Sequence, residues 1–340
     1  MLDPNIVKRL REATKPVSGQ TMAEELGLSR VALWKRIETL KAWGYGIEAS
    51  RRGYRLVHDD GLAPWDFDAP GPVHLFDDIP STMDKAHELA VAGAPSGTMV
   101  LALRQSAGRD RSGSGWISPS GGLYLSLVLR SALPPALAGT MILEAARSTL
   151  GLLEEVGISG LSFAWPGALL GRSDLPGKPA RLGGLLLELA GAMGRVDHYV
   201  LGLGLNVAPV RYIDRASVGD TARSPAKAPG DAREPTGGGG VAGVDRRFVS
   251  LGDLAARPPQ RARLAADLAR DMAKWSADPQ LDPGRWASLL PEGPRTALLW
   301  TGDQLDVVPV AYTARGELLC TGGRLLSIGE CVKLREKGAC

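Results

Sequence analysis

The chain has 340 residues, of which 44% are hydrophobic, so it is long enough for two or three domains with buried cores. It contains no run of about 18 apolar residues, and its first residues, MLDPNIVKRLREATK, are charged, so we expect neither a membrane span nor secretion. The net charge is +3, but residues 1–58 carry 11 Lys and Arg against 6 Asp and Glu, whereas the remainder carries 29 against 31. A basic segment before a nearly neutral body indicates a nucleic-acid-binding module joined to another domain.

The number and spacing of the cysteines and histidines indicate the redox compartment and whether a metal site is expected. The three cysteines, Cys320, Cys331 and Cys340, are an odd number near the C-terminus, which favours free thiols in a reducing compartment. The four histidines share no metal-ligand spacing with one another or with the cysteines. We therefore predict a cytoplasmic protein without a disulfide framework and without a zinc site.

Residues 1–58 have the pattern of a winged helix-turn-helix. DPNIVKRLREA has helical spacing, and VSGQTMAEELGLSRVALWKRIETLKAWGY predicts helix, tight turn and helix. Ser18 and Ser29 are placed to cap these two helices, and Gly27 can adopt the positive φ of a sharp turn. YGIEASRRGYRLV then predicts two short strands around a basic turn. On the second helix, the residues expected to face inward are Val31, Ile37, Leu40 and Trp43.

Such a fold places the second helix in the major groove and the wing on the phosphates or the minor groove. We predict DNA contacts from Arg30, Trp34 and Lys35 on the helix and from Arg51 and Arg52 on the wing. The alternative is a small helical interaction domain with a solvated basic face. Residues 59–72, rich in Pro, Gly and Asp, predict a linker.

From residue 73 onward, helical and strand patterns alternate, which predicts an α/β domain with a mixed sheet extending to about residue 290. SGTMVLALRQSAG and GGLYLSLVLR predict strands on either side of a glycine- and arginine-rich loop. RLGGLLLELAG and HYVLGLGLNV predict two further strands, and RARLAADLARDMAKWSA predicts a helix. Residues 217–247 carry almost no large apolar side chain, so we predict a disordered insertion there.

Five segments of this domain resemble, in order and spacing, the landmarks of biotin protein ligases. They are IPSTMDKAHELA, RQSAGRDRSGSGWISPSGGLYLSLVLR, AWPGALL, ARLGGLLLELAG and LGLGLNVAP. The N-terminal module is similar to that of the bifunctional ligases that also repress the biotin operon. Residues 291–340 resemble the family's C-terminal SH3-like β-barrel. The resemblance implies an α/β (α+β) protein with a winged helix-turn-helix, a mixed-sheet ligase domain and a small barrel.

The resemblance also implies a reaction and its partners. Biotin and ATP with Mg²⁺ would give biotinyl-5′-adenylate, which then acylates a lysine on the biotin carrier domain of a carboxylase. The adenylate would act as corepressor by favouring a homodimer that binds operator DNA. The family's biotin and adenylate contacts would fall on Ser81, Thr82, Gln105, Gly108, Arg109, Arg111, Gly113, Trp116, Gly184 and Asn206. Arg181, in place of the family's lysine, and Arg111 would serve catalysis.

The sequence departs from the family pattern on the nucleotide side. Met83 replaces an asparagine, and Asp110 replaces a loop glycine. Ala164, Gly167 and Ala168 stand where the family has a lysine, an asparagine and an aspartate. Alternative interpretations therefore remain. In one of them the chain is a ligase-derived regulator that senses biotin or its adenylate without ligase activity. In the other it is a paralogue with neither role.

Individual residues also have alternative, purely structural roles. Ser81 and Thr82 can cap the helix that follows them. The loop arginines can be ordinary solvated cations.

Overall fold

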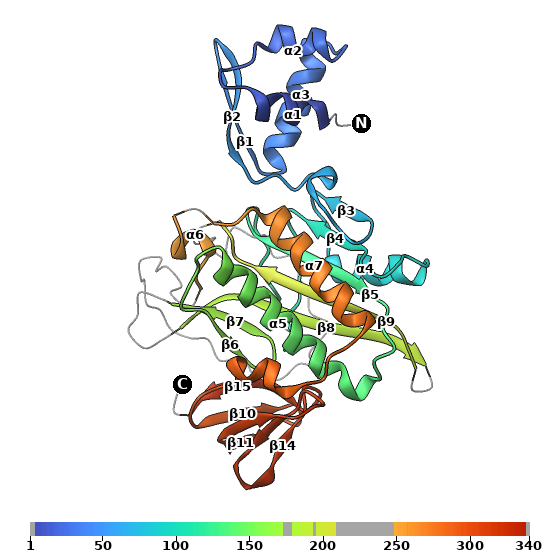
Figure 1. Ribbon diagram of the computed structural model, residues 1–340, viewed down its shortest axis with the longest axis vertical. Helices are drawn as coiled ribbons and strands as arrows, with labels where there is room; N and C mark the ends of the chain where they lie inside the picture. Colours follow the sequence, from blue (N-terminus) through green and yellow to red (C-terminus); the bar gives the residue numbers. More distant parts are fainter. Residues whose placement is uncertain are drawn as a thin grey trace, which may run out of the picture.

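The computed structural model contains an N-terminal helical unit, a central sheet covered by helices, and a C-terminal β-domain (Figure 1). The residues that it describes are 4–113, 115–172, 179–192, 195–208, 248–256 and 258–337. The predicted disordered insertion at 217–247 and the third cysteine, Cys340, lie outside these residues.

The N-terminal unit has the predicted order of helices and strands. It consists of α1 (Pro4–Glu12), α2 (Gly19–Glu25), α3 (Arg30–Ala42) and the antiparallel hairpin of β1 (Tyr45–Ser50) and β2 (Gly53–Asp59). Ser18 and Ser29 cap α2 and α3 through their hydroxyl groups, and Gly27 has a φ of +63°, all as predicted.

One residue of α3 faces the opposite way from our prediction. Val31 is 63% exposed, whereas Leu33 is buried together with Ile37 and Leu40. Leu33, Ile37 and Leu40 are spaced by four and three residues and therefore share one helix face, and Val31 lies outside that stripe. The prediction was right for Ile37 and Leu40 and wrong for Val31, in the first turn of the helix.

The central domain is built on one seven-stranded mixed sheet, as expected, in the order β3-β4-β5-β9-β8-β7-β6. β3 and β4 are parallel, and every other neighbouring pair is antiparallel. The strands are β3 (Val73–Phe76), β4 (Met99–Ala102), β5 (Leu123–Leu129), β6 (Ser162–Ala164), β7 (Ala168–Gly171), β8 (Ala180–Ala192) and β9 (Arg195–Leu205).

The two faces of this sheet differ because side chains alternate along each strand. Leu125, Leu127 and Leu129 of β5 belong to the main apolar core on the face covered by α5 (Ala138–Glu155) and α7 (Arg261–Ala277). Val128, on the other face, packs in a small separate cluster with the helix α4 (Thr82–Val91). Ser126 also points to this second face, which is where the cavity described below lies.

Helix α5, extended by the 3-10 turn that precedes it, is the one described helix long and apolar enough to cross a membrane. Two thirds of its apolar window is buried inside the protein. It packs against β8 and α7, so its hydrophobicity is accounted for by the core of the domain.

The C-terminal β-domain has two three-stranded sheets. One contains β11 (Gln304–Val307), β10 (Arg295–Leu299) and β15 (Cys331–Glu336); the other contains β12 (Pro309–Tyr312), β13 (Leu318–Cys320) and β14 (Leu325–Leu326). Its turns place Gly302, Gly316 and Gly322 at positive φ. Cys320 and Cys331 are buried free thiols, as predicted.

A buried ion pair joins the N-terminal unit to the central domain. Asp60 follows β2, and Arg261 begins α7. The Arg261 guanidinium donates to the Asp60 carboxylate at 2.7 Å, to the Asp60 carbonyl oxygen at 3.0 Å and to the Gly122 carbonyl oxygen at 3.1 Å. The Arg261 side chain is only 5% exposed.

Because removal of one partner leaves the other charge buried and unpaired, Arg261→Ala should reduce the free energy of unfolding by about 3 kcal/mol. Urea-induced unfolding followed by tryptophan fluorescence measures this loss. Arg263→Ala is the control on the same helix, because Arg263 is 77% exposed and should change stability by less than about 0.5 kcal/mol. Equal effects of the two substitutions would contradict the assignment.

Candidate functional site

The second face of the sheet carries a cavity of about 1460 Å³. Its walls come from the start of α4, the loop of residues 106–116 (loop 106–116), the turn between β6 and β7, the strands β8 and β9, and the C-terminal strand β15. The charged side chains that line it in the described part of the chain are Arg109, Arg111, Arg172, Arg181, Lys333, Arg335, Asp110 and Asp253. Six cations against two carboxylates favour an anionic ligand.

One wall of the cavity is a network of hydroxyl and amide groups. The side-chain oxygen of Gln105 accepts hydrogen bonds from the Thr82 backbone N–H at 2.8 Å and from the Thr82 hydroxyl at 3.0 Å. The Gln105 amide nitrogen donates to the Ser118 hydroxyl at 3.0 Å, and the Ser126 hydroxyl donates to that of Thr82 at 2.8 Å. These bonds fix the orientation of the groups that a polar ring would contact. Ser81, predicted beside them, caps α4 and lines the same wall.

The floor of the cavity is backbone without side chains. Gly184 of β8 lies opposite Gly204 of β9 in the strand register. A Cβ atom at Gly184 would lie 2.8 Å from the Arg181 guanidinium, and one at Gly204 would lie 2.7 Å from the indole nitrogen of Trp116. A Cβ at Gly202 would meet the sulfur of Met83 at 2.6 Å. A side chain at Gly204 would displace the rigid Trp116 ring, and one at Gly184 or Gly202 would displace the flexible end of Arg181 or Met83.

Arg181 is the cation best placed to act on an anion in the cavity. Its guanidinium lies 5.3 Å from the centre of the Trp116 ring and donates to the Gly183 carbonyl oxygen at 3.2 Å. Among the described residues it has no ion pair. Burial lowers the pKa of this guanidinium, and the nearby Asp110 carboxylate partly opposes that shift. A desolvated arginine of this kind is stabilised when an anion binds beside it.

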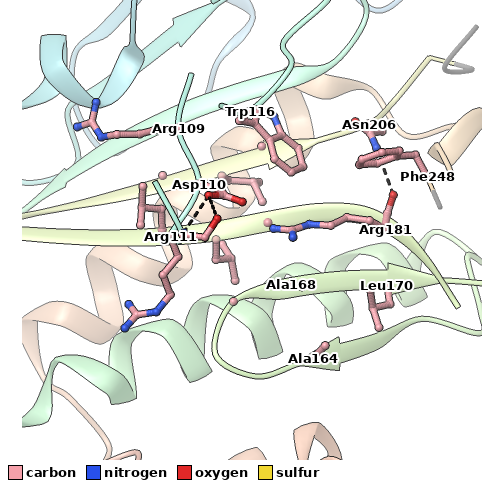
Figure 2. Close-up of a pocket in the computed structure, with 18 of the residues that line it drawn as sticks. Arg109, Asp110, Arg111, Trp116, Ala164, Ala168, Leu170, Arg181, Asn206 and Phe248 are labelled. Carbon is pink, nitrogen blue, oxygen red and sulfur yellow. Dashed lines mark hydrogen bonds between the residues drawn. The ribbon is translucent and has the colours of Figure 1, made fainter. Parts of the chain in front are cut away.

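Arg109 and Arg111 of loop 106–116 are held outside the centre of the cavity. Arg109 makes a two-point ion pair with Glu188 at 2.9 and 2.8 Å and a second ion pair with Asp84 at 2.7 Å, which raise its pKa. The Arg111 guanidinium donates to the backbone carbonyl oxygens of Ile328 and Cys331 in the C-terminal β-domain. Figure 2 shows both guanidinium groups pointing away from Arg181.

Asn206, Gly108 and Gly113 have other positions than those expected of direct ligand contacts. Asn206 lines the cavity, but its amide nitrogen donates to the carbonyl oxygens of Arg181 and Val249 at 3.3 and 3.2 Å. It thereby ties the end of β9 to the start of β8. Gly108 and Gly113 shape the loop backbone and are not among the described residues that line the cavity. That these three contact a ligand remains a prediction.

Three of the sequence departures from the family pattern lie together on one side of the cavity. Ala164, Gly167 and Ala168 all line it around the turn between β6 and β7, and they provide neither a cation nor a carboxylate. Asp253 is occupied in the capping box of α6 (Leu251–Leu254), where its carboxylate accepts from Ser250. The described lining therefore provides no carboxylate set that fits a protein-held Mg²⁺, which prefers several oxygen ligands.

Several residues of the site were not found from the sequence. Glu188 and Asp84 pair with Arg109, and His87 lies 3.0 Å from Glu188 and from His198. A glutamate within the apolar run LLLEL, an even number of residues after Gly184, was the available signal, because such residues share one face of a strand. Lys333 and Arg335 reach the cavity from the C-terminal β-domain, which no local pattern indicates.

The N-terminal unit presents the predicted DNA-binding residues to solvent. Arg30, Trp34 and Lys35 are exposed on α3, and Trp34 remains 52% exposed despite its size. Arg51 and Arg52 are exposed in the turn between β1 and β2. An exposed tryptophan between cations at the start of the second helix is typical of a binding face rather than of a core.

Two family models match this chain, one in the N-terminal unit and one in the central domain. Residues 5–55 match the model of an HTH domain, and residues 75–206 match that of the Biotin/lipoate A/B protein ligase family. A biotin–[acetyl-CoA-carboxylase] ligase of Mycobacterium tuberculosis is 30% identical over 262 residues, which cover 72% of this chain and 83% of that protein. The chain belongs to the biotin protein ligase family.

Other relatives match a smaller share. The bifunctional ligase/repressor BirA of Bacillus subtilis is 36% identical to this biotin protein ligase family member over 201 residues, or 56% of this chain and 60% of that protein. The match thus spans about 60% of that relative's length. The fold is similar to that of the Aquifex aeolicus biotin protein ligase in complex with biotin and ATP, with a TM-score of 0.55, 20% identity, and coverage of 78% of this chain and 99% of that one.

The ion pairs of Glu188 predict an acid sensitivity. Hydrogen bonds from His87 and Arg109 lower the pKa of Glu188 from 4.5 to about 2. Since the folded-state pKa is depressed, the stabilisation is present above about pH 4.5 and is lost as the pH falls toward 2. Wild-type protein should therefore lose about 1–2 kcal/mol more stability between pH 6 and pH 3 than Glu188→Gln, after allowance for partial exposure.

Urea unfolding at the two pH values measures this difference. Glu88→Gln is the matched control, because the Glu88 side chain is 67% exposed and its one ion pair among the described residues is with Lys85. Parallel pH profiles for wild type and Glu188→Gln would contradict the assigned coupling.

Proposed function

We propose that this protein is a biotin protein ligase that also binds DNA as a transcriptional repressor. It would form biotinyl-5′-AMP from biotin and ATP and transfer biotin to a lysine of a carboxylase's biotin carrier domain, in the cytoplasm. The observation that carries this proposal is the pairing, in one cavity, of the Thr82–Gln105–Ser126 network with the buried Arg181. The network suits a ureido ring, and Arg181 suits the negative charge of a phosphate.

In the first step a carboxylate oxygen of biotin attacks the α-phosphorus of ATP, and the bond to pyrophosphate breaks. Two anions must approach one another, so a fixed cation beside the α-phosphate lowers the barrier. Arg181 supplies that charge. Stacking on Trp116 and the bond to Gly183 hold its guanidinium in place, so little reorganisation is needed when the phosphate charge develops.

In the second step the amine of the acceptor lysine attacks the acyl carbon, AMP leaves, and the extra proton of the new amide passes to solvent. Until then the mixed anhydride must be kept from water. Loop 106–116 contributes one wall of the cavity and is anchored at Arg109 and Arg111, which supports a shielding role. Mg²⁺ would arrive bound to the phosphates of ATP and supply charge neutralisation; the chain's own residues position the nucleotide.

The N-terminal unit would bind operator DNA with α3 in the major groove and the β1–β2 turn on the backbone. Two-fold operators are bound by dimers, so a homodimer is the expected DNA-binding form. The adenylate would favour that form by fixing the loop conformation of each subunit.

One alternative function rests on a specific observation. The cavity wall formed by Ala164, Gly167 and Ala168 has no charged group, so the nucleotide side is poorer in catalytic groups than the biotin side. This favours a regulator that senses biotin or its adenylate without ligating it.

Biotin-dependent ATP–pyrophosphate exchange, with label transfer to a biotin carrier domain, separates the two functions. Exchange and transfer are expected for the ligase. Biotin binding by calorimetry without exchange would leave the sensor, and the absence of both would overturn both proposals.

If Arg181 stabilises the transferring phosphate, Arg181→Ala should lower the exchange rate about 100-fold and leave biotin affinity within about threefold. Arg181→Lys should retain an intermediate rate, because it keeps the charge but loses the planar stacking. Arg195→Ala, which removes an arginine 84% exposed at the start of β9, is the control and should exchange normally. A normal rate for Arg181→Ala would remove Arg181 from catalysis.

DNA binding is tested with mixed-sequence duplex DNA across a range of salt concentrations. The double variant Arg51→Ala/Arg52→Ala should weaken binding and reduce the slope of log affinity against log salt by about 2, one for each lost phosphate contact. Arg315→Ala, an exposed arginine in the C-terminal β-domain, is the charge control. Equal slopes for all three proteins would place the DNA elsewhere.

A further inference from the structure

The two arginines of loop 106–116 fix which side chain the loop turns toward Arg181. Arg109 is held by Glu188 and Asp84 on one side, and Arg111 by the carbonyl oxygens of Ile328 and Cys331 on the other. Both anchors lie away from Arg181 (Figure 2). Asp110 lies between these two anchored residues, and its side chain lines the cavity.

A tight turn holds the Asp110 carboxylate in this place. The Gly113 N–H donates to the Asp110 carbonyl oxygen at 3.2 Å, and Gly113 has a φ of +78°. One carboxylate oxygen of Asp110 accepts from the Ser112 N–H at 2.9 Å and from the Ser112 hydroxyl at 2.7 Å. An aspartate at the first position of a turn commonly accepts such bonds, so the carboxylate is oriented before any ligand binds.

The charge of Asp110 acts on Arg181. Asp110 is the carboxylate whose charge favours the ionised form of Arg181 against the effect of burial. In Figure 2 the Asp110 carboxylate lies on the side of the loop that faces Arg181, and the Trp116 ring lies next to Arg181. Among the described lining residues the other carboxylate, Asp253, is taken up in the α6 capping box.

We propose that Asp110 is a specificity-determining residue of this cavity: it is the internal counter-ion of Arg181 in the ligand-free protein and lowers the affinity for phosphate-bearing ligands. This inference rests on the proposed function. A ligand phosphate that reaches Arg181 brings a second negative charge close to Asp110, and like charges in a partly desolvated cavity repel. The same carboxylate stabilises the buried Arg181 when no ligand is present, so the arginine can be kept charged and in place.

A role for Asp110 as a metal ligand predicts the opposite effect. If Asp110 held Mg²⁺ for the triphosphate, loss of its charge would weaken nucleotide binding, and only when Mg²⁺ is present. The observed bonds favour the counter-ion, because Ser112 donates twice to one carboxylate oxygen and the described lining offers no second acidic ligand beside it.

Asp110→Asn is the sharpest variant, because an asparagine oxygen can still accept both Ser112 bonds while the charge is lost. Ser112→Ala is its matched control: it removes one hydrogen bond of the turn and retains the carboxylate. Binding is measured by calorimetry on the full-length protein with two ligands. One is biotinol-5′-AMP, a stable phosphodiester analogue of the adenylate, and the other is neutral biotinamide.

The counter-ion role predicts that Asp110→Asn binds biotinol-5′-AMP about tenfold more tightly than wild type, with a smaller gain at high salt. Its affinity for biotinamide should be unchanged, and Ser112→Ala should bind both ligands as wild type does. An unchanged or weaker affinity of Asp110→Asn for the phosphodiester overturns the inference and leaves the proposed function intact. If wild-type protein binds neither ligand, the proposed function and the inference both fail.

Discussion

The close pairing of β8 and β9 through glycine is the constraint on which the site depends. Gly184 and Gly204 are register partners on the cavity face, and a Cβ atom at either would collide with the Arg181 guanidinium or the Trp116 indole. The missing Cβ atoms leave room against these strands for the Trp116 ring and the Arg181 guanidinium, which lies 5.3 Å from the ring centre. The leucines that alternate with these glycines, such as Leu203, belong to the main core, so the same strands provide both a packed face and an open one.

Three of the cavity arginines, Arg109, Arg111 and Arg181, differ in their hydrogen-bond and ion-pair partners because each reaches different acceptors. Arg109 and Arg111 meet acceptors on α4, β8 and the C-terminal β-domain, and these bonds convert two loop cations into anchors. Of these three arginines, Arg181 is the one without an ion pair among the described residues: it meets an aromatic face and one carbonyl oxygen, with the Asp110 carboxylate nearby, so its charge remains to act on a ligand. An arginine paired with two carboxylates contributes little net charge to its surroundings, whereas a desolvated arginine without an ion pair contributes much more.

The two functional regions are linked by packing rather than by a shared surface. The basic residues of α3 and of the β1–β2 turn face solvent, and the cavity lies on the sheet of another domain. Arg261 connects them physically, because it bonds both Asp60 after β2 and the Gly122 carbonyl oxygen at the start of β5. Gly122 closely follows loop 106–116 in the chain. One of the residues that hold the N-terminal unit therefore also contacts the segment between that loop and β5.

The sequence by itself determined the elements with strong local signals. Ser18, Ser29 and Gly27 defined the helix-turn-helix, because caps and positive-φ turns act within a few residues. The apolar segments RLGGLLLELAG and HYVLGLGLNV indicated the strands β8 and β9, and the order of motifs indicated the family. The phase of α3 at Val31 was set wrongly, since a single apolar residue in the first turn fits either face until the neighbouring helices are placed.

The tertiary structure alone decided the partners of the charged residues. The partners of Arg109 are 25 and 79 residues away in the chain, and those of Arg111 are more than 200 residues away. No periodicity connects such positions, so the sequence indicated arginines near an anion but not which of them the fold had already paired. It also showed Asp110 as a departure from a glycine pattern without showing where its carboxylate lies. Charge acts through space over distances that only the folded chain defines, and that is why the sequence could indicate residues that line the cavity but not its electrostatics.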